Sequence, residues 1–537
     1  MSLWKKAFNR ESLFYFSLSL LIILAGQLPI FIHYFHTPVG FYFPFLDQSA
    51  PSDFYYIALI RYGMGMEWLT KIPYITVPHQ ASLIQIPFIL MGKLSLFTGI
   101  GPAEMLAIFR IIGGSLFLFA AIKLINLLLP KNITKIAFLI FLFVEPLFSF
   151  KISIFREPYV DWIWHFGDAA RRISVAPPHY TIGKGLALLS VFLLFSHLNR
   201  SNKPRFYGSL ILGFIGGIVY PPPNFLIAFS LAMAIAIILV SDKLKFKSIK
   251  ITQLLTFGAY LIACLLPLII LKLELSKGYP WDMWNKVELG WNNPRQQFEL
   301  QYFRVYWWLF LSLPFALIYL PKIFKDATRA LFIFIWSISA YLLFPLADFL
   351  SVGKFRFSEG VQIVPLSIAA ATLVFHFFKK SKIIRAAGVV TLIGYFIVGG
   401  GLVFKESVFR FWPFWKNVYY SPPVLESFKF METKVPKDSI ILTDDAVSTF
   451  LPAFVRVRTL YGFSDFYENY ADFSNDYMSA FKVLKSEEAE STASEFFRKK
   501  NIEYVYLDKT TFGEKPFYPE LLTRIFDNEE IAVYKVK

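Results

Sequence analysis

Residues 106–129 read LAIFRIIGGSLFLFAAIKLINLLL, an almost uninterrupted apolar stretch. A helix rises 1.5 Å per residue, so about 20 such residues cross the roughly 30 Å hydrocarbon core of a bilayer. Comparable apolar blocks occupy residues 13–35, 251–271 and 386–403. The pattern therefore predicts a chain that is built from membrane-spanning helices.

The composition of the whole chain agrees with that prediction. Of 537 residues, 56% are hydrophobic and only 17% are charged, which is more apolar than a soluble enzyme of this size. The single cysteine, Cys264, lies inside an apolar block and excludes a disulfide framework within one chain. The first apolar block follows Lys5, Lys6 and Arg10 but lacks an A-x-A cleavage pattern, so we expect an uncleaved span.

The formal net charge of +16 could indicate a nucleic-acid partner, but the positions of the charges argue against one. Lysine and arginine concentrate in short connectors between apolar blocks, at residues 130–135, 199–205, 243–250, 321–329 and 379–385. This distribution is typical of cytoplasmic loops of membrane proteins. We therefore expect membrane lipids, and no nucleic acid, among the partners.

The basic connectors also predict the topology. They all fall on the cytoplasmic side if residues 81–98, which Pro87, Gly92 and Lys93 interrupt, lie against the outer surface instead of spanning. The predicted spans are then residues 12–35, 105–129, 133–150, 180–198, 207–220, 224–241, 251–272, 303–320, 329–346, 360–378 and 384–403. The predicted fold class is a polytopic all-α bundle of about eleven transmembrane helices. Its N-terminus is cytoplasmic and its expected location is the plasma (inner) membrane.

Two domains are predicted. Residues 1–404 would form the transmembrane domain, with surface helices in the outer loop 36–104, and residues 405–537 a soluble extracytoplasmic α/β domain. The second prediction rests on alternating strand and helix patterns. Strands are expected at residues 439–443, 458–461 and 503–507, a helix at 487–500, and a closing hairpin at 527–534.

Acidic residues follow the first apolar block. Asp47 and Asp53 lie there, and from Asp53 the chain has the pattern of an amphipathic helix with Arg61 two turns further on. A carboxylate at the membrane surface can deprotonate a hydroxyl nucleophile, and an arginine can hold a phosphate. Asp53 or Ser52 could also cap this helix, and spacing alone favours an ordinary cap over a catalytic role for Asp53.

Asp53, Arg61, Trp68, the Pro78-His79 segment and Arg110 together resemble the first outer loop of the GT-C superfamily of membrane glycosyltransferases. The resemblance is closest to the protein O-mannosyltransferase and aminoarabinose-transferase branch. In that branch an acidic residue follows the first span and an arginine opens the second. These positions correspond here to Asp53 and Arg110.

The resemblance implies transfer of a sugar from a polyprenyl-phosphate-linked donor to a lipid, glycan or protein acceptor on the outer face. It implies Asp53 as the general base, with Asp47 as a second catalytic candidate. It also implies Arg61, Arg110 and Arg356 as ligands of the lipid phosphate. Arg356, which precedes a predicted span, could equally anchor a lipid headgroup.

The second outer loop is rich in ionisable groups. Asp161, His165 and His179 could be combined into a metal site, but no H-E-x-x-H pattern is present. We therefore predict no metal ligands and assign His79, Asp161 and His179 to substrate binding. No cofactor is assigned from this pattern, which leaves a divalent cation open.

Two other classes of protein share the general pattern. A flippase or secondary transporter for lipid-linked sugars would also be polytopic, but it usually has internal repeats and ionisable residues deep within its spans. No repeat is evident and most charges lie in loops, which favours the enzyme. A non-catalytic membrane scaffold would have the same sequence features.

Overall fold

The computed structural model describes residues 10–46, 50–143, 177–242, 251–290, 292, 298–324, 327–359, 361–380, 383, 386, 388, 390, 394, 419–463, 470–513 and 518–537. These residues belong to two compact units, which are described separately. The first unit comprises Met1–Leu28, Phe109–Leu273 and Asn285–Arg410, and the second comprises Pro29–Ile108, Glu274–Trp284 and Phe411–Lys537.

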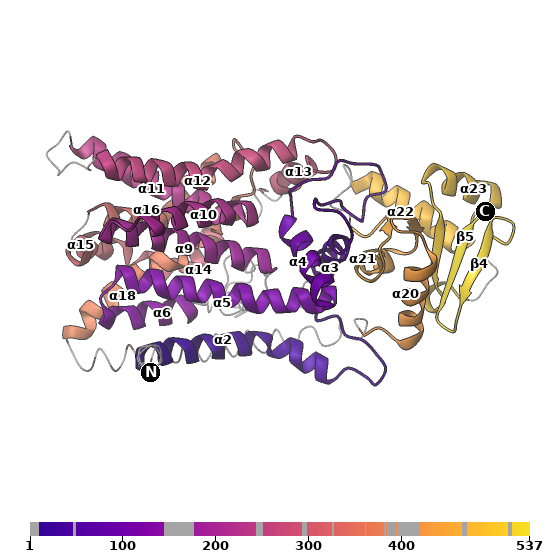
Figure 1. Ribbon diagram of the computed structural model, residues 1–537, viewed down its shortest axis with the longest axis horizontal. Helices are drawn as coiled ribbons and strands as arrows, with labels where there is room; N and C mark the ends of the chain where they lie inside the picture. The colour runs from indigo at the N-terminus through magenta and orange to yellow at the C-terminus, as the bar shows by residue number, and fades with distance from the viewer. Residues whose placement is uncertain are drawn as a thin grey trace. The chain divides into compact units, whose positions relative to one another are not determined.

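The first unit is an assembly of apolar helices (Figure 1). Its residues come from α2 (Arg10–Phe35), α5 (Pro102–Leu128), α6 (Lys131–Phe143), α9 (Pro178–Arg200), α10 (Lys203–Val219), α11 (Pro221–Asp242), α12 (Ile251–Leu275), α13 (Met283–Gly290), α14 (Phe298–Phe310), α15 (Leu313–Phe324), α16 (Ala327–Leu343), η4 (Phe344–Leu346), α17 (Lys354–Ser358) and α18 (Ile363–Lys380). Helix α9 packs on α10, α11 on α16, and α6 on α18. Large side chains such as Phe138, Phe195 and Trp336 are fully buried between them.

Six of the described helices are long and apolar enough to cross a membrane. They are Glu11–Leu28, Pro102–Leu128, Pro178–Arg200, Pro221–Val240, Ile251–Leu275 and Thr328–Leu346, and each coincides with a predicted span. The other described helices do not meet that length and composition, and most of the predicted span 384–403 lies outside the described residues. The fold is therefore compatible with a helical membrane protein, whereas a count of eleven spans is not confirmed.

The predicted span at residues 303–320 differs most clearly from the structure. The chain forms two helices there, because α14 ends at Phe310 and α15 begins at Leu313. Pro314 lies in the first turn of α15, where its missing N–H is tolerated. In the interior of one continuous helix the same proline would remove a hydrogen bond and clash with the preceding turn.

The second unit contains two helices from the loop after the first apolar block, α3 (Ala50–Gly63) and α4 (Ile86–Thr98). Their backbones approach closely, since a β-carbon on Gly92 would lie 2.2 Å from the carbonyl oxygen of Ile60. Every residue from Asp53 to Ile60 is buried. Helix α3, expected to be amphipathic, is covered on more than one side because both α4 and α21 (Asp445–Phe454) pack against it.

The C-terminal part of the second unit is a five-stranded sheet with helices on both faces. Its strands are β1 (Ile440–Leu442), β2 (Arg458–Thr459), β3 (Tyr504–Asp508), β4 (Leu522–Asp527) and β5 (Ile531–Val536). Their order is β2-β1-β3-β5-β4, with β1 parallel to β2 and β3, and β5 antiparallel to β3 and β4. The predicted strands and closing hairpin are confirmed. The predicted domain boundary at residue 404 lies outside the described residues.

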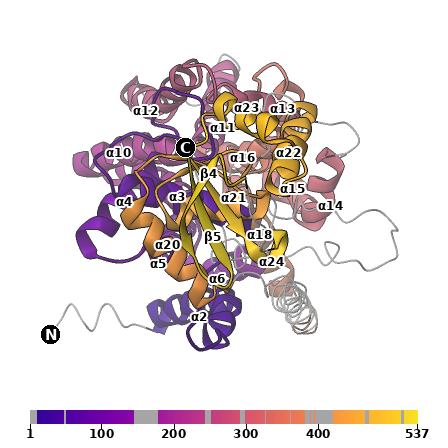
Figure 2. The same ribbon diagram turned by 90° about the vertical axis from the view of Figure 1, so that its right-hand side faces the viewer.

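Successive side chains of β3 point to opposite faces of this sheet, as strand geometry requires. Val505 packs against the core formed with α22 (Tyr470–Leu484) and α23 (Glu490–Lys499). Tyr506 lies on the other face, where its hydroxyl is 2.9 Å from that of Ser427 on α20 (Pro422–Lys434). Figure 2 shows α20 on one side of the strands, and α22 and α23 on the other. The short helix α24 (Lys509–Phe512) follows β3 directly.

Candidate functional site

The predicted site residues are divided between the two units. Asp47 and Asp161 lie outside the described residues. Asp53, Arg61 and His79 belong to the second unit, and Arg110, His179 and Arg356 belong to the first. The arrangement around each group is therefore built up separately.

A network of charged side chains lies among the helices of the first unit. The Arg356 guanidinium places Nη2 2.6 Å from Oε1 of Glu288 on α13, and Nη1 donates to the Tyr220 hydroxyl at 3.3 Å. Tyr220 in turn donates to Oε2 of Glu359 at 2.5 Å, and Nζ of Lys184 lies 3.2 Å from the same oxygen. We call Lys184, Tyr220, Glu288, Arg356 and Glu359 the buried ionic cluster.

Burial makes this cluster energetically demanding. The Lys184 side chain is 7% exposed and that of Glu359 is 1% exposed. Isolated charges lose several kcal/mol of solvation in such surroundings, so they persist only when they are paired and hydrogen-bonded. The cluster satisfies this requirement with two positive and two negative side chains.

Two of the predicted residues meet at the buried ionic cluster. The His179 ring lies 5.8 Å from that of Tyr220, centroid to centroid, and Tyr220 also contacts Arg356. Arg110, on α5 of the same unit, is completely buried. Lys184 and Glu359 were missed by the sequence analysis. The available signal was Lys184 itself, a charge inside the predicted span 180–198 that needs a buried partner.

The second unit contains a cavity of about 640 Å³. Its walls come from α3, from the loop at residues 67–81 and from residues 438–458 of the C-terminal α/β part. The charged side chains that line this cationic cavity are Arg61, Glu67, Lys71, Asp438, Arg456 and Arg458. Positive side chains thus outnumber negative ones by four to two.

Arg456 joins two walls of the cationic cavity. Its Nη2 lies 2.5 Å from Oε1 of Glu67 and 3.0 Å from Oδ2 of Asp438. Burial by itself would raise the pKa of Glu67, but the hydrogen bonds and charge of Arg456 outweigh it and lower that pKa. Glu67 is therefore held as a carboxylate.

Arg61 and His79 line the same cavity but are already committed to structural contacts. Arg61 donates from Nε to the Ala453 carbonyl at 2.8 Å and from Nη1 to both Glu432 oxygens at 3.3 Å. His79 accepts the Ile72 N–H at Nε2 and lies with Nδ1 3.0 Å from the Val77 carbonyl. Burial lowers the pKa of His79, so its ring is neutral. Its two hydrogen bonds hold the loop at residues 67–81 in shape.

Asp53 occupies the first turn of α3 and is 1% exposed. Because α3 begins at Ala50, three residues before Asp53, the expected role of Asp53 as helix cap is wrong. A carboxylate in the first turn stabilises the positive end of the helix dipole, and it is also held rigidly enough for catalysis, so a structural and a catalytic interpretation both remain. The roles assigned to the site residues from the sequence remain predictions.

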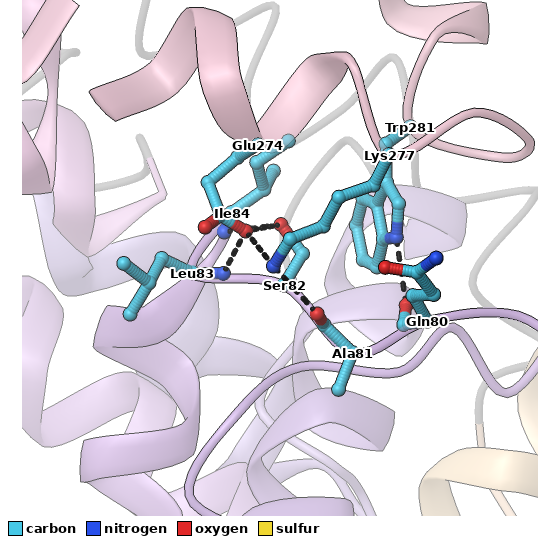
Figure 3. Close-up of polar contacts among 8 residues, drawn as sticks. All are labelled: Gln80, Ala81, Ser82, Leu83, Ile84, Glu274, Lys277 and Trp281. Carbon is cyan, nitrogen blue, oxygen red and sulfur yellow. Dashed lines mark hydrogen bonds and ion pairs between the residues drawn. The ribbon is translucent and has the colours of Figure 1, made fainter. Parts of the chain in front are cut away.

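The loop at residues 67–81, which we call the cavity loop, is fixed at its far end by Glu274 in the last turn of α12 and by residues that follow this helix (Figure 3). Oε2 of Glu274 accepts the Ser82 hydroxyl at 2.7 Å and the Leu83 N–H at 2.9 Å. Lys277 donates from Nζ to the same carboxylate oxygen at 2.6 Å and to the Ala81 carbonyl at 2.9 Å. The carboxylate therefore ties together two segments that are distant in sequence.

We call these contacts of Glu274 and Lys277 the Glu274 clamp. Two further contacts hold the same loop. The indole of Trp281 donates from Nε1 to the Gln80 carbonyl at 2.8 Å (Figure 3). Thr70 and Ser82 form an antiparallel backbone bridge with N–H to carbonyl distances of 2.8 and 3.0 Å. The loop is consequently held in shape without a ligand.

Among the residues that the structure describes, no three His, Cys, Asp or Glu side chains are grouped so that they could hold a metal ion. Of the ligand set considered from the sequence, only His179 is described, and it is surrounded by the aromatic rings of Tyr180 and Tyr220.

No protein-family model matches this chain, and no curated protein matches its sequence. Functional inference therefore rests on the geometry and chemistry of the buried ionic cluster and the cationic cavity.

Proposed function

We propose that the chain is a membrane glycosyltransferase that moves a sugar from a polyprenyl-phosphate-linked donor to a lipid, glycan or protein acceptor. The supporting observation is the buried ionic cluster, in which Arg356 and His179 meet at Tyr220. Charged groups among apolar helices are costly and are usually retained for function. A guanidinium is well suited to a phosphate, since its planar donors match the phosphate oxygens.

In the proposed reaction Asp53 takes the proton of the acceptor hydroxyl or amine. The acceptor atom then forms a bond to the anomeric carbon, and the bond from that carbon to the phosphate oxygen breaks. Arg356 and Arg110 are the candidates to stabilise the charge on the departing polyprenyl phosphate. The proposal places the protein in the plasma (inner) membrane, with a cytoplasmic N-terminus and the C-terminal α/β part outside.

Purified full-length protein in lipid nanodiscs provides the test. With a polyprenyl-phosphate donor carrying a radiolabelled sugar, transfer of label to an acceptor or to water is measured. We expect Asp53→Asn to lower the rate by roughly 10²-fold or more, because asparagine cannot accept the proton. Asparagine has nearly the shape of aspartate and loses only a charge–dipole contribution of about 0.3–1 kcal/mol in the first turn, so folding should be preserved.

The matched control is Asp444→Asn. Asp444 caps α21 by accepting the Val447 N–H at 2.9 Å, and it has no role in the proposed chemistry. Transfer should therefore continue at nearly the wild-type rate in this variant. Undiminished transfer by Asp53→Asn would reject Asp53 as the base and leave a structural role in the first turn of α3.

The buried ionic cluster also favours a second candidate function. An ionic pair such as Lys184 and Glu359 within apolar helices is expected in a flippase or transporter for lipid-linked sugars. Reconstituted vesicles distinguish the two functions, since a transporter moves the labelled carrier between leaflets without releasing sugar. Movement that Lys184→Met abolishes, together with no sugar release, would favour the transporter over the glycosyltransferase.

A further inference from the structure

The cationic cavity has more positive charge than its own contacts neutralise. Arg61 is paired with Glu432, and Arg456 is paired with both Glu67 and Asp438. These pairs account for every carboxylate that lines the cavity. Arg456 carries one positive charge against the two negative charges of Glu67 and Asp438, so its pairs leave one negative charge over. The two remaining cations, Lys71 and Arg458, therefore bring the net charge of the cavity to +1.

Among the residues that the structure describes, neither of these two cations forms an ion pair with a carboxylate. Lys71 is exposed and makes no ion pair within the described part of the chain. Arg458 donates to two carbonyl oxygens, from Nε to Asp438 at 2.7 Å and from Nη1 to Thr76 at 3.1 Å. A carbonyl oxygen satisfies a donor and fixes its direction, but it does not cancel the positive charge. The cavity is thus prepared for an anion.

The rest of the cavity wall is apolar and open. Trp68 is 64% exposed, Val77 56% and Leu69 37%. All three line the same cavity as Lys71 and Arg458. Exposed apolar side chains beside uncancelled cations fit a ligand with both an anionic and an apolar part.

We propose that the cationic cavity binds the phosphate group of an amphiphile. Lys71 and Arg458 receive the phosphate, and Trp68, Leu69 and Val77 contact the adjoining apolar portion. A phosphate offers several strong acceptor oxygens and up to two charges, so it can engage cations that come from two separate segments. A carboxylate offers only two oxygens and one charge.

The cavity needs little rearrangement to accept such a ligand. Its volume of about 640 Å³ falls within the roughly 300–1,000 Å³ that is usual for small-molecule sites. One wall is held by the Arg456 ion pairs and the loop by the Glu274 clamp. This site does not depend on the proposed sugar transfer, since binding can be measured without a donor or turnover.

The test uses full-length protein in a neutral detergent and three probes. These are dihexanoyl phosphatidic acid below its micellar concentration, dihexanoyl phosphatidylcholine as the zwitterionic analogue, and inorganic phosphate. Equilibrium binding of each probe is measured by titration. We expect saturable binding of phosphatidic acid, and binding at least about tenfold weaker for the other two, because each lacks either the net charge or the apolar part.

The decisive variant is Lys71→Glu, because Lys71 is exposed and its replacement breaks no ion pair. We expect it to weaken phosphatidic acid binding about tenfold or more, as for loss of a charge-assisted contact. Lys429→Glu is the matched control, an exposed lysine on α20 outside the cavity. Arg458→Lys, which keeps the charge and loses the planar fork, should weaken binding less than Lys71→Glu does.

Each contrary result overturns a stated part of the proposal. Equal weakening by Lys71→Glu and Lys429→Glu would show attraction to general surface charge instead of a site. Unchanged binding by Lys71→Glu, or no saturable binding of phosphatidic acid, would reject the cavity. Equal affinity for inorganic phosphate would reject the apolar part of the ligand and identify free phosphate as its source.

Discussion

The buried ionic cluster and the cationic cavity both collect arginine, lysine and carboxylates, but they balance charge differently. In the cluster, Lys184 faces Glu359 and Arg356 faces Glu288, with side chains at most 16% exposed. In the cavity, Lys71 and Arg458 form no ion pair with another described residue, and the lining side chains carry a surplus of positive charge.

The difference follows from the surroundings. Among apolar side chains a charge must be neutralised by a partner because water does not solvate it. At an open cavity, water and salt screen the excess, so the chain tolerates an uncancelled cation until a ligand arrives. The first arrangement favours fixed geometry within the helices, and the second favours capture of an anion from outside.

The largest expected effect tests the buried side of this contrast. Glu359→Gln leaves the Lys184 ammonium without that carboxylate, and breaking a buried pair in this way costs about 3–5 kcal/mol of stability. Denaturant titration of the purified full-length protein in mixed micelles measures the loss. The double variant Lys184→Met with Glu359→Gln should recover part of it, because the ammonium is removed together with its carboxylate partner.

An exposed ion pair serves as the control for that measurement. Lys482 lies 3.9 Å from Glu488, and the two side chains are 53% and 30% exposed. Lys482→Met should therefore change the free energy of unfolding by no more than about 1 kcal/mol. Equal losses for Glu359→Gln and Lys482→Met would show that burial does not separate these two pairs.

The same contrast explains how much of the fold could be predicted from the sequence. A long apolar run such as residues 106–129 and the alternation at residues 503–507 are local patterns, and the structure has a helix and a strand there. A break such as the one before Pro314 depends on a single residue within an otherwise helical pattern. The position of such a break is hard to predict when the surrounding residues are almost all hydrophobic.

The candidate sites depended much less on local pattern. The role of Arg61 is decided by Ala453 and Glu432, far along the chain, and these partners convert a predicted phosphate ligand into a link between helices. The role of Glu359 is likewise decided by its contacts with Lys184 and Tyr220, which are distant in sequence. Sequence spacing identifies residue types, but tertiary contacts decide which cations are already neutralised.

A smaller effect tests the scaffold of the cationic cavity. Gly92→Ala would place a methyl group 2.2 Å from the Ile60 carbonyl oxygen, so α3 and α4 must separate at a cost of about 1–3 kcal/mol. Gly258 of α12 has no atom within 4 Å of the corresponding position, and Gly258→Ala should cost nothing. Hydrogen exchange of residues 50–63 should increase only in Gly92→Ala. An unchanged exchange rate would show that the close approach of the two helices is not needed to hold this wall.

The smallest effect concerns Glu67, whose side chain is 31% exposed and therefore partly screened. At neutral pH, Glu67→Gln should lower the free energy of unfolding by no more than about 1 kcal/mol. Because Arg456 lowers the pKa of Glu67 in the folded protein, this contribution is complete above the ordinary value of 4.5 and is lost as the pH falls below it. The difference between wild type and Glu67→Gln should shrink accordingly in titrations below pH 4.5. If Glu67→Gln lost as much free energy of unfolding as Glu359→Gln, the cavity wall would depend on charge pairing as strongly as the buried ionic cluster does. The surplus of positive charge in the cationic cavity would then need another explanation.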